Sequence, residues 1–244
     1  MKSRLGVLIT GELSRLNKYN VFSISVLVAI IWGAVLFFID EEALGSMLPF
    51  VLLIDASLMS VMYIGTVTYF EKNESTISTM LVTPTTNNEL VLSKVIANVI
   101  HNLFSSTLII VVFFFIRDID INLPLLFLGI IIVTTFFTIG GLSLSYYLKD
   151  FTSMLVAIMA ISFLLLIPTA LYLFNVLTWE GWEYILLISP VQAAEYIISG
   201  GFNGYEFDYH YFVSIAYLGL GSPLLYLFHS LPKFQSYAIK QSGV

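Results

Sequence analysis

Residues 123–148 have the sequence LPLLFLGIIIVTTFFTIGGLSLSYYL, which contains no charged side chain. A helix needs about 20 mostly apolar residues to cross the hydrocarbon core of a bilayer. Further stretches of this kind flank it on both sides. We therefore expect an all-α, polytopic membrane protein in which residues 1–244 form one transmembrane domain. Its six predicted spans are residues 21–39, 47–70, 95–116, 123–148, 151–174 and 210–231.

The composition of the whole chain agrees with this expectation. Of its 244 residues, 58% are hydrophobic and 11% are charged, whereas a soluble domain is about 45–50% apolar and about 25% charged. Such a composition excludes a disordered or nucleic-acid-binding protein and argues against a soluble enzyme. The absence of cysteine excludes a disulfide scaffold and thiolate metal sites.

The distribution of basic residues predicts the orientation of the chain. With both termini in the cytoplasm, nine of the ten basic residues face inward and only Arg117 faces outward, as the positive-inside rule favours. The first apolar run is too long for a cleavable signal peptide. With no sorting signal, we expect a bacterial cytoplasmic membrane. The inward residues are Lys2, Arg4, Arg15, Lys18, Lys72, Lys94, Lys149, Lys233 and Lys240.

Two cytoplasmic segments have helical patterns. Residues 3–17 predict an amphipathic helix on the inner membrane surface, with Glu12 inside its apolar arc. This helix is either a simple anchor, or it presents Glu12 to a protein partner. In the loop of residues 71–94, a short helix is expected from Glu74 to Val82, ended by Pro84. Thr86 and Glu89 have the spacing of a capping box before the third span.

The short loop helix carries an apolar knob made of Ile77, Met80 and Leu81. Because these residues follow i, i+3, i+4 spacing, they share one helix face. The knob either folds back onto lipid headgroups or fits a groove in another protein.

The loop resembles that of the ABC type-2 exporter permease family, through Glu71, Glu74, Met80-Leu81, Thr83-Pro84, Glu89-Leu90 and Lys94. Residues 184–198, broken at Ser189-Pro190 and containing Glu195, resemble the outer re-entrant segment of the family. The resemblance implies a transporter of two permeases, here a homodimer, and two cytoplasmic ATPase subunits. It also implies that ATP and magnesium are bound by the ATPase, and that this chain holds no cofactor. The residues expected to dock the ATPase are Glu71, Glu74, Ile77, Met80, Leu81 and Pro84, with Glu12 as a further candidate.

Catalytic and metal-binding motifs are missing from the sequence. There is no Gly-x-x-x-x-Gly-Lys-Ser/Thr loop to hold ATP, and Ile198-Ser-Gly-Gly-Phe202 is best explained as a turn. His101, His210 and His229 lack the spacing of metal ligands. We therefore expect a transport subunit without catalytic activity of its own.

Polar residues within the spans are candidates for a translocation pathway. A carboxylate such as Asp55 is costly inside a membrane and is a functional candidate by default; the alternative is a structural role or solvation at the outer end of the span. Asn98, His101 and Asn102 either form interhelical hydrogen bonds or line a wet cavity. On a regular helix, Met59, Met62 and Thr66 share the face of Asp55.

These observations favour export of an amphipathic substrate, such as a drug or an antimicrobial or toxin peptide, with ATP hydrolysed by the partner. The alternative is a self-contained secondary transporter or channel that uses Asp55 as its proton or ion site.

Overall fold

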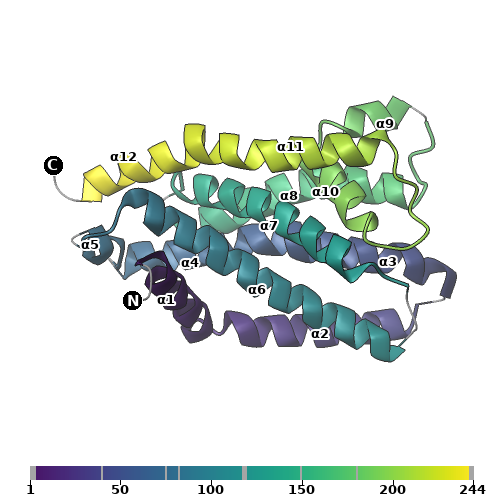
Figure 1. The fold of residues 1–244 in the computed structure, drawn as a ribbon, viewed down its shortest axis with the longest axis horizontal. Helices are drawn as coiled ribbons and strands as arrows, with labels where there is room; N and C mark the ends of the chain where they lie inside the picture. The colour runs from purple at the N-terminus through teal and green to yellow at the C-terminus, as the bar shows by residue number, and fades with distance from the viewer. Residues whose placement is uncertain are drawn as a thin grey trace.

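The computed structural model describes residues 4–39, 41–74, 76–81, 83–116, 120–148, 150–179 and 181–241. Their regular structure is helical, apart from one isolated antiparallel bridge between Ile121 and Phe202. The long helices run along one common axis (Figure 1). The elements are α1 (Arg4–Lys18), α2 (Val21–Phe37), α3 (Glu41–Ile54), the π-helical turn η1 (Asp55–Met59), α4 (Ser60–Asn73), α5 (Thr76–Leu81), α6 (Asn87–Ile116), α7 (Leu123–Ser145), α8 (Phe151–Leu173), α9 (Gly181–Leu186), α10 (Pro190–Ser199), α11 (Tyr209–Leu225), a second π-helical turn η2 (Tyr226–Ser230) and α12 (Leu231–Gln241).

The predicted all-α, polytopic architecture is confirmed. Within the described residues, five helical segments are long and apolar enough to cross a membrane, and a sixth is obtained if α1 and α2 are counted together. These two helices are bent by 60° relative to each other. The bend occurs at Asn20, whose φ of 58° is left-handed, a conformation that asparagine tolerates better than most residues.

Several helix boundaries differ from the predicted spans; the helix of the second span, for example, begins as α3 at Glu41 and not at residue 47. The second span continues through α4 to Asn73, so that Glu71 belongs to this helix and not to the loop. The third span begins at Asn87, directly after its cap. There the Thr86 backbone N–H donates to Glu89 Oε2 (2.8 Å) and the Glu89 N–H donates to Thr86 Oγ1 (3.2 Å). The predicted capping box is therefore confirmed. The last helix extends beyond residue 231 through α12.

The two ends of the bundle carry different elements. α1, α5 and α12 lie at one end, and α9 and α10 lie toward the other (Figure 1). We call these the α5 end and the α9 end. The predicted loop helix is present as α5, although it is shorter than expected; residues 75 and 82 lie outside the described part of the chain.

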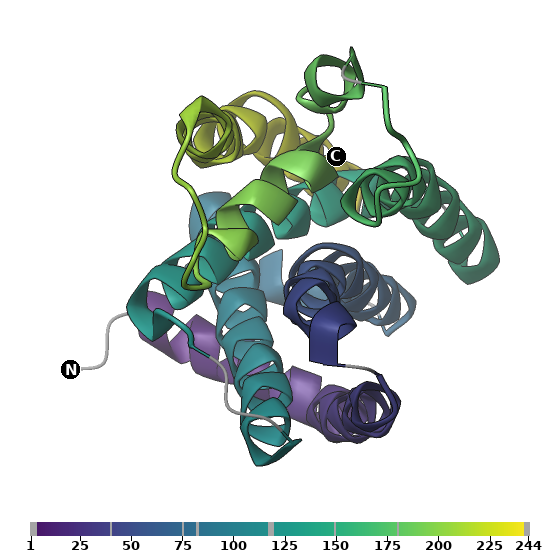
Figure 2. The ribbon, with the colours of Figure 1, turned by 90° about the vertical axis from the view of Figure 1, so that its right-hand side faces the viewer.

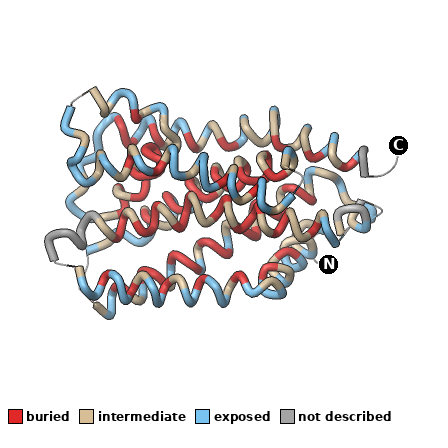
Figure 3. The backbone as a smooth tube through the Cα atoms, turned by 180° about the vertical axis from the view of Figure 1, so that it is seen from behind, coloured by how far each residue is buried: buried red, intermediate tan, exposed pale blue. Residues whose placement is uncertain are grey.

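Buried residues concentrate along the middle of the bundle (Figure 3), where α4 packs against α7. Gly141 permits this contact, because a Cβ at this position would lie 2.7 Å from Ile64 Cγ2 and 3.1 Å from Val61 Cα. By contrast, α8 lies at the edge of the bundle when viewed from the α9 end (Figure 2). In its most apolar window, 22% of the residues are buried, compared with 67% in the second span.

At its start, α8 is capped by Asp150, whose carboxylate accepts hydrogen bonds from the backbone N–H (2.8 Å) and the hydroxyl (2.7 Å) of Ser153. These bonds favour the ionised carboxylate and hold the pKa of Asp150 below its ordinary value.

Candidate functional site

Four ionic side chains meet inside the α5 end of the bundle. We call Glu12, Arg15, Glu71 and Lys94 the ion-pair cluster. Glu12 Oε1 lies 3.0 Å from both Lys94 Nζ and Arg15 Nη2, and Glu71 Oε1 pairs with both cations. Glu71 is fully buried, and Lys94 and Glu12 are only 2% and 3% exposed. Two carboxylates thus face two cations, as buried charges require.

Three helices contribute to this cluster. Glu12 and Arg15 are one turn apart on α1, so both lie on one face, and α1 packs along α6, which carries Lys94. Glu71 comes from the last turn of α4. Glu12 and Glu71 are therefore buried within a single copy of the chain. The apolar arc of α1 faces the chain itself, and Glu12 belongs to that arc. That Glu12 and Glu71 help to dock an ATPase stays a prediction.

The segment around α5 is attached to α1 by several contacts. Arg15 Nη2 lies 3.8 Å from Met80 Sδ, and Arg4 Nη1 donates to the Pro84 carbonyl (3.2 Å). The Tyr19 hydroxyl donates to Glu74 Oε2 (3.0 Å). Met80 and Pro84 thus touch α1, and Glu74 touches Tyr19, the residue that follows α1. The side chains of Ile77 and Leu81 lie outside the described part of the structure.

A second group of polar side chains lies at mid-length in the bundle. We call Asp55, Asn102, Ser105, Ser106 and Thr134 the mid-span cluster. Ser105 Oγ donates to Asp55 Oδ1 (2.9 Å), Ser106 Oγ donates to Asp55 Oδ2 (3.0 Å), and Asn102 Nδ2 lies 3.3 Å from Oδ2. Thr134 Oγ1 donates to Asn102 Oδ1 (2.7 Å). Asp55 therefore links η1 to α6 through neutral donors of α6. Asn102 in turn links α6 to α7 through Thr134.

The other polar candidates of the third span also bond to neighbouring helices. Asn98 Nδ2 donates to Thr138 Oγ1 (2.7 Å), and His101 Nε2 lies 2.9 Å from Ser25 Oγ. His101 also makes an edge-to-face contact with Tyr63, at 4.8 Å between ring centroids. Of the two interpretations considered for Asn98, His101 and Asn102, the contacts agree with interhelical hydrogen bonding. A role in translocation stays a prediction.

The π-helical turn η1 interrupts the predicted polar stripe. A π turn contains one residue more than an α turn, so the regular spacing from Asp55 to Met62 and Thr66 does not hold across it. At this turn the Asp55 carbonyl accepts a hydrogen bond from a side chain of another helix, Asn102 Nδ2 (3.0 Å). Met59 packs toward α1 and α2, and Met62 packs in the main apolar core.

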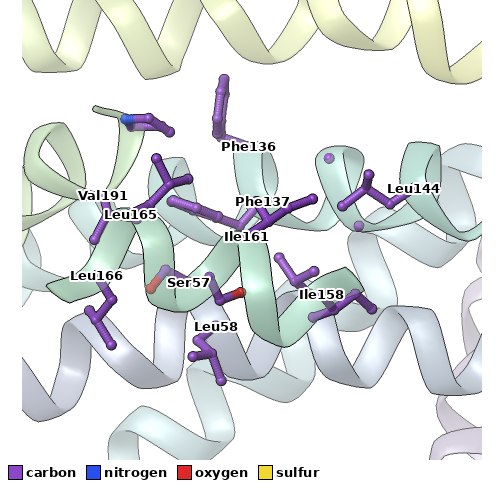
Figure 4. A pocket seen from close by; sticks show the side chains of 15 residues that line it. Ser57, Leu58, Phe136, Phe137, Leu144, Ile158, Ile161, Leu165, Leu166 and Val191 are labelled. Atoms are coloured by element: carbon purple, nitrogen blue, oxygen red, sulfur yellow. The ribbon is translucent and has the colours of Figure 1, made fainter. Parts of the chain in front are cut away.

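A cavity of about 150 Å³ lies beside η1, between α4, α7, α8 and α10 (Figure 4). Ser57 and Leu58 of η1 form one wall, Phe136 and Phe137 of α7 form another, and α8 contributes Ile161. None of the predicted pathway residues lines this cavity. A cavity of this kind reflects missing side-chain volume, so it leaves no motif in the sequence.

The sequence model of one protein family, described as "ABC-2 type transporter", matches residues 13–202. The chain belongs to this family. The match begins within α1, ends after α10, and includes Arg15, Glu71, Lys94 and every residue that lines the cavity. Comparison with curated proteins gives no match to the chain.

As an ABC-2 permease, the chain is a multi-pass membrane component of an ABC-type transport system. Permeases of this family work with an ATPase partner. The resemblance of the loop and the span pattern to this family is thereby confirmed. Sequence reasoning missed Arg15 and Lys94 as partners of Glu12 and Glu71; the available signal was basic residues next to apolar faces at span ends.

Proposed function

We propose that this permease is the membrane subunit of an ATP-driven exporter and that its ATPase subunit docks on α5. The observation that carries the proposal is the ion-pair cluster behind α5. Arg15 contacts both Met80 of α5 and Glu71 of α4, and Glu71 in turn pairs with Lys94 of α6. A displacement of α5 therefore acts on the second and third spans together.

The expected mechanism is a change of population between two packings of the spans. Nucleotide binding by the ATPase moves α5 and α1 as one body, because Arg4 and Arg15 of α1 hold the α5 segment. Differential contacts with the ATPase then favour one arrangement of the spans over the other. The permease carries out no covalent step in this scheme.

The proposed assembly contains two copies of the permease and two ATPase subunits in a bacterial cytoplasmic membrane. ATP and magnesium are bound by the ATPases, and this chain contributes no cofactor. A second copy of the permease would cover part of α8, which buries little of its surface within one copy. The substrate class we propose is an amphipathic drug or peptide, because the interior of the permease is mainly apolar.

Docking on α5 is tested by co-purification. The permease is extracted in mild detergent from its native membrane, and mass spectrometry identifies any protein with a phosphate-binding loop that accompanies it. We expect Met80→Asp to remove the ATPase while the permease remains inserted. The matched control is Ser236→Asp, an exposed position on α12 at the same end, which should retain the ATPase. Undiminished binding to the Met80→Asp variant would contradict docking on α5.

The orientation is tested by labelling single cysteines, for which this chain is suited because it contains none. Exposed Thr79 in α5 and exposed Asn203 near the α9 end are each replaced by cysteine. In intact cells, a membrane-impermeant maleimide should label Asn203→Cys and not Thr79→Cys. After permeabilisation, both should react. The opposite pattern in intact cells would place α5 outside and overturn the proposal.

A further inference from the structure

The cavity beside η1 is almost entirely apolar. Ser57 and Ser162 are the polar residues that line it, and the remaining walls are aliphatic, aromatic or glycine. The Ser57 hydroxyl already donates to the Leu53 carbonyl (2.5 Å). A buried water needs two to four polar partners, and these walls offer few. The cavity therefore suits an apolar occupant better than water.

Two adjacent glycines explain why the cavity stays open. A Cβ added at Gly140 would meet no atom within 4 Å, whereas a Cβ at Gly141 would press against Ile64 and Val61 of α4. Gly141 thus fixes the rotation of α7 against α4, and Gly140 is left facing open space. Because α7 cannot turn without losing its contact with α4, neighbouring side chains do not fill this space.

The size of the cavity indicates what it can hold. In another protein, an engineered cavity of about 150 Å³ lined by Leu, Ile and Phe stays dry and binds benzene or xenon. The cavity described here has a volume of about 150 Å³ and similar walls, with Phe136 and Phe137 side by side in sequence on one of them. Atoms that line an empty cavity lack dispersion contacts that an apolar ligand restores.

We propose that this cavity is a binding site for a small apolar molecule, of the size of one aromatic ring, within a single copy of the permease. Such a ligand contacts η1, α7, α8 and α10 at once and holds the weakly packed α8 against the rest of the bundle. It reaches the site from the bilayer, beside α8. The proposal does not depend on an ATPase, on transport or on a second copy.

The test measures binding of fluorobenzene to the purified permease in lipid nanodiscs by ¹⁹F NMR. Partition of fluorobenzene into lipid gives a background that does not saturate, so the saturable component reports binding to the protein, and the filling variants below assign it to this cavity. For the wild-type chain we expect saturable binding, and a thermal midpoint of unfolding that is higher with fluorobenzene than without it. A purely linear signal for the wild-type chain would overturn the proposal.

Filling variants locate the site. Gly140→Leu should abolish saturable binding, and Gly140→Ala should weaken it. The alanine variant adds one methyl group to open space and has the higher helix propensity, so that it is expected to fold even if the leucine variant does not. The matched control is Gly11→Leu on α1, an exposed position where a Cβ also meets no atom within 4 Å, and it should bind as the wild type does. Unchanged affinity in a folded Gly140 variant would overturn the assignment, whereas the permease and exporter assignments would stand.

Discussion

The ion-pair cluster and the mid-span cluster each stabilise a buried carboxylate, but with different kinds of partner. Each buries a carboxylate almost completely, since Glu71 is 0% and Asp55 is 1% exposed. Glu71 faces Arg15 and Lys94, whereas the contacts of Asp55 are the hydroxyls of Ser105 and Ser106 and the amide of Asn102. A cation becomes more costly toward the middle of a bilayer. This chain thus uses ionic partners near the α5 end of the bundle and neutral donors at mid-length.

The largest effect is expected from removing one cation of the ion-pair cluster. Lys94→Met leaves Glu12 and Glu71 close together with only Arg15 between them. Removing one partner of a buried ion pair costs about 3–5 kcal/mol. We expect a large decrease in the thermal midpoint of the detergent-purified permease, measured by differential scanning fluorimetry.

A double variant provides the control for this prediction. Lys94→Met with Glu71→Gln removes one charge of each sign, and it should recover part of the lost stability. If Lys94→Met alone left the midpoint unchanged, the cluster would not contribute to the folded state as described.

A smaller effect is expected at the mid-span cluster. Asp55→Asn keeps the shape of the side chain but replaces one acceptor oxygen by an amide that faces the donors Ser106 and Asn102. An unmade hydrogen bond of this kind costs about 1–3 kcal/mol. The midpoint should therefore fall by less than in Lys94→Met, and Ser106→Ala should have a still smaller effect.

Transport measurements separate the two roles considered for Asp55. If this residue serves translocation, Asp55→Asn lowers the transport rate of folded, assembled protein. An unchanged rate at equal amounts of inserted protein would leave only its structural role.

The smallest effect is expected where the ions are exposed. Lys18 Nζ lies 3.8 Å from Glu74 Oε1, with side chains 69% and 44% exposed. Exposed pairs contribute about 0–1 kcal/mol. Lys18→Ala should change the free energy of unfolding by less than about 1 kcal/mol, so that the thermal midpoint stays close to that of the wild type. A decrease comparable to that of Lys94→Met would contradict the distinction between buried and exposed pairs.

Much of the fold could be predicted because it follows from local patterns. Hydropathy located the long helices, and the Thr86–Glu89 spacing located the start of α6, which the hydrogen bonds between these residues confirm. The break within residues 184–198 was likewise visible in the sequence at Ser189-Pro190, where α10 begins. These features depend on neighbouring residues alone.

The features that could not be predicted depend on contacts between distant residues. Glu12 and Lys94 are separated by 82 positions, and their pairing depends on the way α1 lies along α6. The π turn at Asp55 preserves the apolar character of its helix and shifts only its phase, so periodicity did not reveal it. Gly140 and Gly141 are neighbours in the sequence, but only Gly141 is tightly packed, because packing depends on which helix each one faces.

The position of Lys94 in the chain has a consequence for biosynthesis. Ribosomes make the chain from its N-terminus, so Glu12 and Glu71 are translated before the cation that completes their cluster. Until the third span has been made, Arg15 alone faces both carboxylates. The N-terminal helix therefore cannot reach its final docking when the first two spans enter the bilayer, and its assembly is completed only after the third has joined them.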